Sequence, residues 1–184
     1  MLQWARANSC PWDKDTRTYA AGRGHLEVLQ WARANGCPWD EKTTFFAAKM
    51  GHEALLQALI EAGADVNKAI NNGETPLIVA AQNGHDAVVR ALIELGADIN
   101  KASDKGVTPL YFAAQMGHEA VLRALIELGA DVNKANNDGL TPLYVGAQEG
   151  HEAMVRALIE LGADINKASD KGVTPLHIAA QKGH

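Results

Sequence analysis

A repeat of 33 residues is the feature that most constrains the fold of this chain. The motif Gly-x-Thr-Pro-Leu occurs four times with one spacing, at Gly73, Gly106, Gly139 and Gly172, with Pro76, Pro109, Pro142 and Pro175 in step. Gly-His pairs largely keep the same period, with histidines at His52, His85, His118, His151 and His184. A fixed period of this length predicts a stack of equivalent units, each of which contacts mainly its neighbours.

One unit, residues 104–136, predicts two short helices and a projecting loop. Thr108 and Pro109 are typical of a helix start, because Thr caps the first turn and Pro lacks only an N–H that would have no partner there. The first helix should end at Gly117, and a second should cover 119–128 with one apolar face. The expected buried residues are Leu110, Phe112, Ala113 and Ala114 of the first helix, and Val121, Leu122, Leu125 and Ile126 of the second. The segment that follows closes on an Asp-Gly pair suited to a tight reversing turn.

Three motifs in these units resemble the ankyrin repeat. They are Gly-x-Thr-Pro-Leu, Ala-Ala-x-x-Gly-His and Leu-Gly-Ala-Asp-Ile/Val-Asn, and each recurs along the chain. The resemblance implies an all-α fold, a solenoid of stacked helix-turn-helix units with projecting β-hairpin loops. It also implies a scaffold that binds a protein partner on a concave face formed by the hairpin tips and the first helices.

A shorter variant of the unit, with a short loop, occupies the N-terminal part of the chain. The helix ending Ala-Ala-x-x-Gly-His occurs at 20–25 and again at 47–52, so six residues are missing from the usual spacing. The short loop Cys-Pro-Trp-Asp places Trp39 where the longer loops have an apolar anchor, so we expect this ring to be buried. Trp31 and Ala32 exchange the small and large residues of the longer repeats, a volume-conserving swap that favours packing. An aromatic ligand pocket is the alternative interpretation of the tryptophans.

The chain divides into seven parts, of which the first and the last are incomplete. They are a partial repeat at 1–13, a short repeat at 14–40, a hybrid repeat at 41–70, three 33-residue repeats at 71–103, 104–136 and 137–169, and a partial repeat at 170–184. Because neither end has a polar capping unit, we expect a fragment of a longer repeat protein that self-associates through its uncapped ends. The apolar residues expected at these ends are Leu2, Trp4, Leu176 and Ile178.

The composition favours an intracellular, cytoplasmic protein that binds neither nucleic acid nor membranes. The 184 residues carry a net charge of −5, and they contain neither a long apolar run nor a signal segment. Residues 49–184 hold eleven Lys and Arg against seventeen Asp and Glu. This excess of acidic residues disfavours contact with phosphate backbones.

No set of residues is typical of an enzyme, a metal site or a cofactor site. Histidines of successive repeats are expected roughly 8–10 Å apart, too far to share one metal ion, so each should instead hydrogen-bond a neighbouring repeat. The same spacing keeps Cys10 and Cys37 beyond the Cα separation of about 7 Å that a disulfide allows. We therefore expect no catalysis, no cofactor and no metal in these residues.

The positions at which the repeats differ are the candidate contacts for a protein partner. They are Glu74, Val107, Leu140 and Val173 at the tips, and Ile78, Tyr111, Met116, Tyr144, Glu149 and His177 on the first helices. Tyr111 and Tyr144 stand where the family usually has His, so they either contact the partner or pack on the next unit, and the sequence favours neither. Asn100, Asn133 and Asn166 resemble ankyrin asparagines that are β-hydroxylated in some organisms. The alternative function is a targeting or spacer arm of a larger enzyme or ubiquitin-ligase-type protein.

Overall fold

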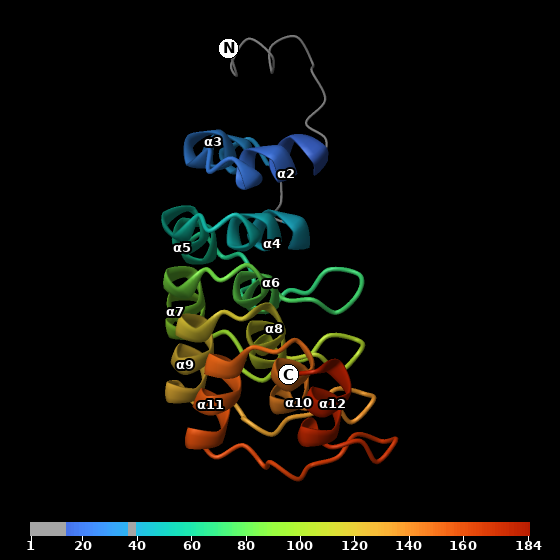
Figure 1. Cartoon of the computed structure of the whole chain (residues 1–184). Coiled ribbons are helices and arrows are strands. Elements are labelled where there is room, and N and C mark those ends of the chain that lie inside the picture. Colours follow the sequence, from blue (N-terminus) through green and yellow to red (C-terminus); the bar gives the residue numbers. More distant parts are fainter. Residues whose placement is uncertain (1–13, 37–39) are drawn as a thin grey trace.

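The computed structural model describes residues 14–36 and 40–184, which form a stack of helix pairs (Figure 1). The first helices are α2 (Lys14–Gly22), α4 (Glu41–Lys49), α6 (Pro76–Gln82), α8 (Pro109–Met116), α10 (Pro142–Gln148) and α12 (Pro175–Lys182). The second helices are α3 (Leu26–Ala34), α5 (Glu53–Glu61), α7 (Asp86–Glu94), α9 (Glu119–Glu127) and α11 (Glu152–Glu160). Each first helix packs on the next first helix, so the expected all-α solenoid is observed. No helix in the described ranges is long and apolar enough to cross a membrane.

Threonine-proline pairs begin the four C-terminal first helices, as the sequence predicts. The Thr108 hydroxyl accepts a hydrogen bond from the backbone N of Tyr111 at 3.2 Å, and Pro109 is the first helical residue. The same cap recurs at Thr75, Thr141 and Thr174. Gly117 ends α8 with a φ of 76°, a left-handed conformation that favours glycine.

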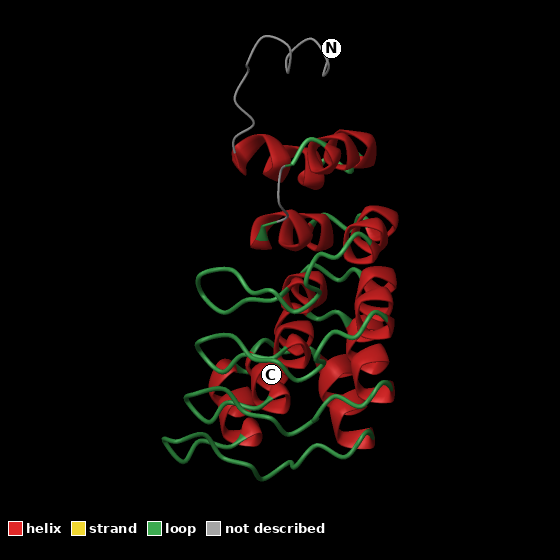
Figure 2. Cartoon of the chain, turned by 180° about the vertical axis from the view of Figure 1, so that it is seen from behind, coloured by secondary structure: helices red, strands yellow, loops and turns green. Residues whose placement is uncertain are grey.

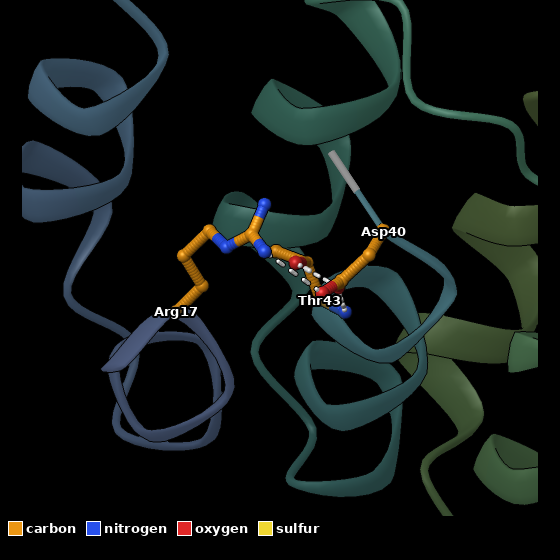
Figure 3. A network of polar contacts seen from close by, with 3 residues as sticks. All are labelled: Arg17, Asp40 and Thr43. Atoms are coloured by element: carbon orange, nitrogen blue, oxygen red, sulfur yellow. Dashed lines mark hydrogen bonds and ion pairs between the residues drawn. The ribbon is translucent and has the colours of Figure 1, made fainter. Parts of the chain in front are cut away.

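The helix after the short loop begins differently, because Asp40 replaces the Thr-Pro start. One carboxylate oxygen of Asp40 accepts hydrogen bonds from the backbone N of Thr43 at 3.0 Å and from its hydroxyl at 2.7 Å. The other oxygen lies 3.4 Å from Nη2 of Arg17 on α2, so the cap also ties two successive repeats together (Figure 3). This ion pair was not predicted from the sequence. The helix cap itself is indicated by the pattern Asp-x-x-Thr in the short repeats.

Paired alanines bring the first helices close together, and larger residues fill the space between the two columns of helices. The alanine pairs in which both residues are fully buried are Ala47 and Ala48, Ala80 and Ala81, and Ala113 and Ala114. α9, predicted over 119–128, ends at Glu127. Its fully buried large side chains are Val121, Leu122 and Leu125. In α3, Ala32 is buried where the other second helices have Leu, whereas Trp31 is half-buried. The predictions for Leu2, Trp4, Cys10, Cys37 and Trp39 lie outside the described residues.

Histidines join each repeat to the one before it. The Nε2 atoms of His52, His85, His118 and His151 lie 2.9 to 3.0 Å from the carbonyl oxygens of Gly22, Lys49, Gln82 and Gln115, respectively. These carbonyls lie in the last turns of the preceding first helices, where partners within the helix are missing. The prediction that each imidazole bonds a neighbouring repeat is therefore confirmed for these four histidines.

The long loops project to one side of the stack, but the described loops contain none of the β-strands that a β-hairpin has (Figure 2). In the loop before α8, the backbone N of Ser103 donates to the carbonyl of Val107 at 3.0 Å, and the N of Gly106 donates to the carbonyl of Ser103 at 2.8 Å. One facing pair is too few for a strand, and no described residue forms one. The loops are thus hairpin turns.

Asparagine side chains hold successive loops at a constant spacing. The Oδ1 atom of Asn133 accepts a hydrogen bond from the backbone N of Asp164 at 2.8 Å, and its Nδ2 donates to the carbonyl of Gly162 at 3.3 Å. Asn67 makes the same two bonds two repeats earlier. Between them, Asn100 accepts the equivalent hydrogen bond from the backbone N of Asp131. Each of these residues therefore bridges two repeats.

Candidate functional site

One exposed position at the end of each first helix carries a different type of side chain in most repeats. The six exposed residues at this position are Arg23, Met50, Asn83, Met116, Glu149 and Lys182. The exposed tip residues that project beside the C-terminal first helices are Asp104, Lys105, Asn137, Asp138, Asp170 and Lys171. We call the surface formed by these two sets of residues the inner face.

Backbone hydrogen bonds between successive tips set the spacing of the loops on the inner face. The backbone N of Asp104 donates to the carbonyl of Asn72 at 3.2 Å, and the N of Asn137 donates to the carbonyl of Lys105 at 3.1 Å. The bond from Asp170 to Asp138, at 3.2 Å, continues the row. The exposed tip side chains are therefore carried on a bonded backbone.

Four of the predicted contact residues are buried, which corrects the expectation that they line an exposed face. Tyr111 and Tyr144 are each only 7% exposed, Val107 is equally buried, and Ile78 is completely buried. The residue after Leu is covered in α6, α8 and α10, where another repeat follows, which a single repeat does not reveal. Of the two interpretations of the tyrosines, their burial favours packing.

The other predicted contact residues keep exposed surface. Met116, Glu149 and His177 are exposed, and Glu74, Leu140 and Val173 are half-buried at the tips. The Nδ1 atom of His177 lies 2.8 Å from the hydroxyl of Thr174, which holds the ring on its own helix. The exposed members of the predicted set thus lie near the ends of the first helices and at the tips.

The pKa of the buried Tyr111 hydroxyl is raised above its ordinary value. Burial of the phenol raises its pKa, and the charges of Asp138 at a tip and Glu149 at a helix end raise it further, because each disfavours the phenolate. Both carboxylates are thus close enough to act on one hydroxyl. A tip and a helix end of the inner face therefore both act on this buried hydroxyl.

The comparison with known families agrees with this architecture. A family model for ankyrin repeats in three copies matches residues 17–103, 100–169 and 134–184. The chain belongs to the ankyrin-repeat family. Ankyrin repeats generally mediate protein–protein interaction, so this ankyrin-repeat chain has the fold of a binding scaffold. A comparison with curated proteins found no match.

Several depressions mark the surface of the ankyrin stack. One, about 620 Å³, lies between α2 and α4. A second, about 290 Å³, lies between two tips and is lined in part by Asp138, Tyr144 and Asp170. A third, about 300 Å³, lies beside α11 and α12. The depression between α2 and α4 was not predicted from the sequence. One feature of the sequence indicates it: Gly22 stands where the other first helices have Lys or Gln.

The three candidate hydroxylation sites in the ankyrin loops differ in their contacts. The side chains of Asn100 and Asn133 take part in the bonds between repeats, whereas Asn166 is exposed and only its backbone N bonds the Asp164 carboxylate, at 2.9 Å. Asn166 is therefore the most accessible of the three. In the part of the chain that the structure describes, no three His, Cys, Asp or Glu side chains converge as metal ligands would.

Proposed function

We propose that this ankyrin-repeat chain binds a protein partner on its inner face. The observation that supports this function is a contrast between two sets of positions. The position of the second alanine of each pair keeps the same residue from repeat to repeat, whereas the exposed position near the end of each first helix shows five residue types in six repeats. A constant frame that carries changing side chains is suited to the recognition of one particular surface.

The burial of the side chains divides the candidate residues into two groups. The proposed contact residues are Glu74, Met116, Leu140, Glu149, Val173 and His177, because each keeps exposed surface. The proposed supporting residues are Ile78, Val107, Tyr111 and Tyr144, which pack behind them. Met116 is the central apolar contact, since methionine adapts its shape to a partner surface.

Two pairs of substitutions, matched for exposure, test this function. Met116 on the inner face is 43% exposed, and Leu128, at the end of α9 in the same repeat, is 42% exposed. We expect the variant with Met116→Arg and Glu149→Arg to lose the proteins that the wild-type chain captures from a lysate. The control variant with Leu128→Arg and Glu160→Arg should retain them. Circular dichroism of both variants checks that the helices and the melting temperature are unchanged.

The outcome of this capture experiment separates the two functional classes. A partner kept by both variants contradicts binding on the inner face. The alternative function, a targeting or spacer arm of a larger enzyme or ligase, predicts that result. Equal loss from both variants also contradicts the proposal, because it shows that capture depends on surface charge in general rather than on one face.

We also propose that the chain self-associates through α11 and α12. Beside the depression at these helices, Leu176 is 78% exposed, and Ile165 and Ile159 are each about half exposed. A contiguous apolar surface of this kind favours burial against another molecule. Sedimentation velocity should therefore show association that increases with concentration, and Leu176→Gln with Ile165→Gln should abolish it. A wild-type chain that stays monomeric at high concentration contradicts this proposal.

A further inference from the structure

The depression between α2 and α4 differs from the rest of the inner face in size and in chemistry. Its volume is about 620 Å³, roughly twice that of the other depressions on the stack. Residues of both helices line it: Thr18, Tyr19, Gly22, Arg23, Phe46 and Met50. Tyr19 is 71% exposed and Met50 is 52% exposed, so aromatic and thioether surface faces solvent on both sides of the opening.

A missing side chain creates this opening. Gly22 is the last residue of α2, and the equivalent residues of the next four first helices are Lys49, Gln82, Gln115 and Gln148. The backbone of Gly22 is not in the left-handed region, and its carbonyl oxygen lies 3.0 Å from Nε2 of His52 as in the other repeats. Among the described residues, a Cβ atom at this position would meet only the Met50 side chain, at 4.0 Å. The described residues therefore leave space here for a group from outside the chain.

The apolar walls are suited to receive a side chain. The ring of Phe46 packs edge-on against Phe45 at a centroid distance of 5.6 Å, and Phe45 is itself buried, so this wall is held in place. Met50, on the next turn of α4, is flexible and polarisable, and methionine surfaces of this kind adapt to an inserted apolar group. The depression thus combines one fixed aromatic wall with one adaptable wall.

The rim of the depression is cationic. Arg23 lines it and is exposed, and the ammonium group of Lys49 lies 5.9 Å from the centroid of the Phe46 ring. Among the described residues neither cation forms an ion pair, whereas Arg17 nearby is engaged with Asp40. The centre of the inner face instead carries charges of both signs, from Asp104, Lys105, Asp138 and Glu149. A partner segment that matches this end of the face must therefore carry negative charge.

We propose that this depression binds an apolar side chain, such as Leu, Phe or Met, from a peptide segment whose flanking residues are Asp or Glu. The apolar group occupies the space beside Gly22, and the acidic groups face Arg23 and Lys49. A small molecule is a poorer match, because such ligands are enclosed over most of their surface and the walls here are open. Two cations are also fewer than the clusters that bind anionic membranes. The inference rests on the proposed function and names the partner chemistry for one end of the inner face.

Synthetic peptides and the full chain test the inference. The first peptide has Leu-Phe at its centre and Asp and Glu on both sides; the second replaces Leu-Phe with Ser-Ser, and the third replaces the acidic residues with Lys and Arg. We expect only the first to shift the backbone amide signals of residues 18–23 and 46–50 in NMR titrations. Its affinity should fall as the salt concentration rises, because charge contributes to the contact.

Two variants of the chain make the test specific. Gly22→Gln installs the residue that four equivalent helices carry, so it should preserve the helix and the melting temperature and yet weaken binding of the first peptide by about tenfold or more. Arg23→Glu with Lys49→Glu should weaken it to a similar extent. The control is Lys68→Glu with Arg156→Glu, which changes two exposed cations outside the inner face and should leave the affinity unchanged.

Several results overturn the inference. The inference is contradicted if the first peptide shifts no amide signal at millimolar concentration. It is also contradicted if the basic peptide binds equally well, or if Gly22→Gln binds the first peptide with undiminished affinity. These failures are distinguishable from failure of the proposed function, because capture that depends on Met116 and Glu149 can persist while the depression binds nothing. Conversely, the first peptide can bind the depression while capture from a lysate does not depend on Met116 and Glu149. That result supports the depression as a binding site and contradicts the proposal that the inner face as a whole binds a partner.

Discussion

Asn133 offers a quantitative test of how the repeats are coupled, because a natural control lies one repeat away. Replacement of Asn133 by Ala removes a hydrogen bond of 2.8 Å from Asp164 and one of 3.3 Å to Gly162. A net hydrogen bond stabilises a fold by about 0.5–1.5 kcal/mol, so we expect a loss of about 1–2 kcal/mol. The groups left behind are exposed, which removes the larger penalty that buried unpaired groups carry.

The control is Asn166→Ala. Asn166 has similar sequence neighbours, with Ile165 in place of Val132, but in the described structure its side chain makes no hydrogen bond. Its replacement should therefore change the free energy of unfolding by less than about 0.5 kcal/mol. Urea denaturation followed by circular dichroism measures both losses. For a chain of this length, the melting temperature of Asn133→Ala should fall by about 2–8 °C.

A third variant divides the effect between the two bonds. Asn133→Asp keeps an oxygen that accepts the hydrogen bond from Asp164 and loses the donor to Gly162, so its loss of stability should lie between those of the other two variants. Equal losses in Asn133→Ala and Asn166→Ala would refute the reasoning, because they would show that the side-chain bonds between repeats contribute nothing beyond the properties of the loop itself.

Three further predictions follow from the packing and the charges. Gly139→Ala should destabilise the chain by about 1–3 kcal/mol more than Gly162→Ala in chemical denaturation. Both residues have positive φ, but a Cβ at Gly139 would lie 2.5 Å from a carboxylate oxygen of the next tip, whereas the space at Gly162 is empty. Because folding raises the pKa of Tyr111 above its ordinary value of 10.0, the stability that its neutral form contributes is complete below pH 10 and falls as the pH rises further. Above pH 10 the wild-type chain should therefore lose more free energy of unfolding than Tyr111→Phe, in denaturation series at each pH. If the asparagines are hydroxylated, intact-mass and peptide mass spectrometry of protein from its own source should show added oxygen first at Asn166, the most accessible site, and unmodified asparagines would rule this out.

The sequence by itself determined the features that depend on short stretches of chain. Thr108 and Pro109 start a helix because the cap and the fixed backbone angle of proline act within one turn. Gly117 ends that helix because glycine adopts the left-handed conformation without strain. The 33-residue period placed His118 at the same point in every unit, and equivalent points in a stack must contact equivalent neighbours, so even this contact between repeats was predictable.

Only the tertiary structure decided which side chains remain available to a partner. The sequence left open whether Tyr111 contacts a partner or packs on the next unit, because its neighbours in space belong to the next tip and the next helix, which no local pattern describes. The pairing of Arg17 with Asp40 and the space beside Gly22 likewise arise between helices. The physical reason is that a repeat specifies its own helices through local hydrogen bonding and steric limits, whereas burial and electrostatic potential are sums over neighbouring repeats and take their values only once the units are stacked.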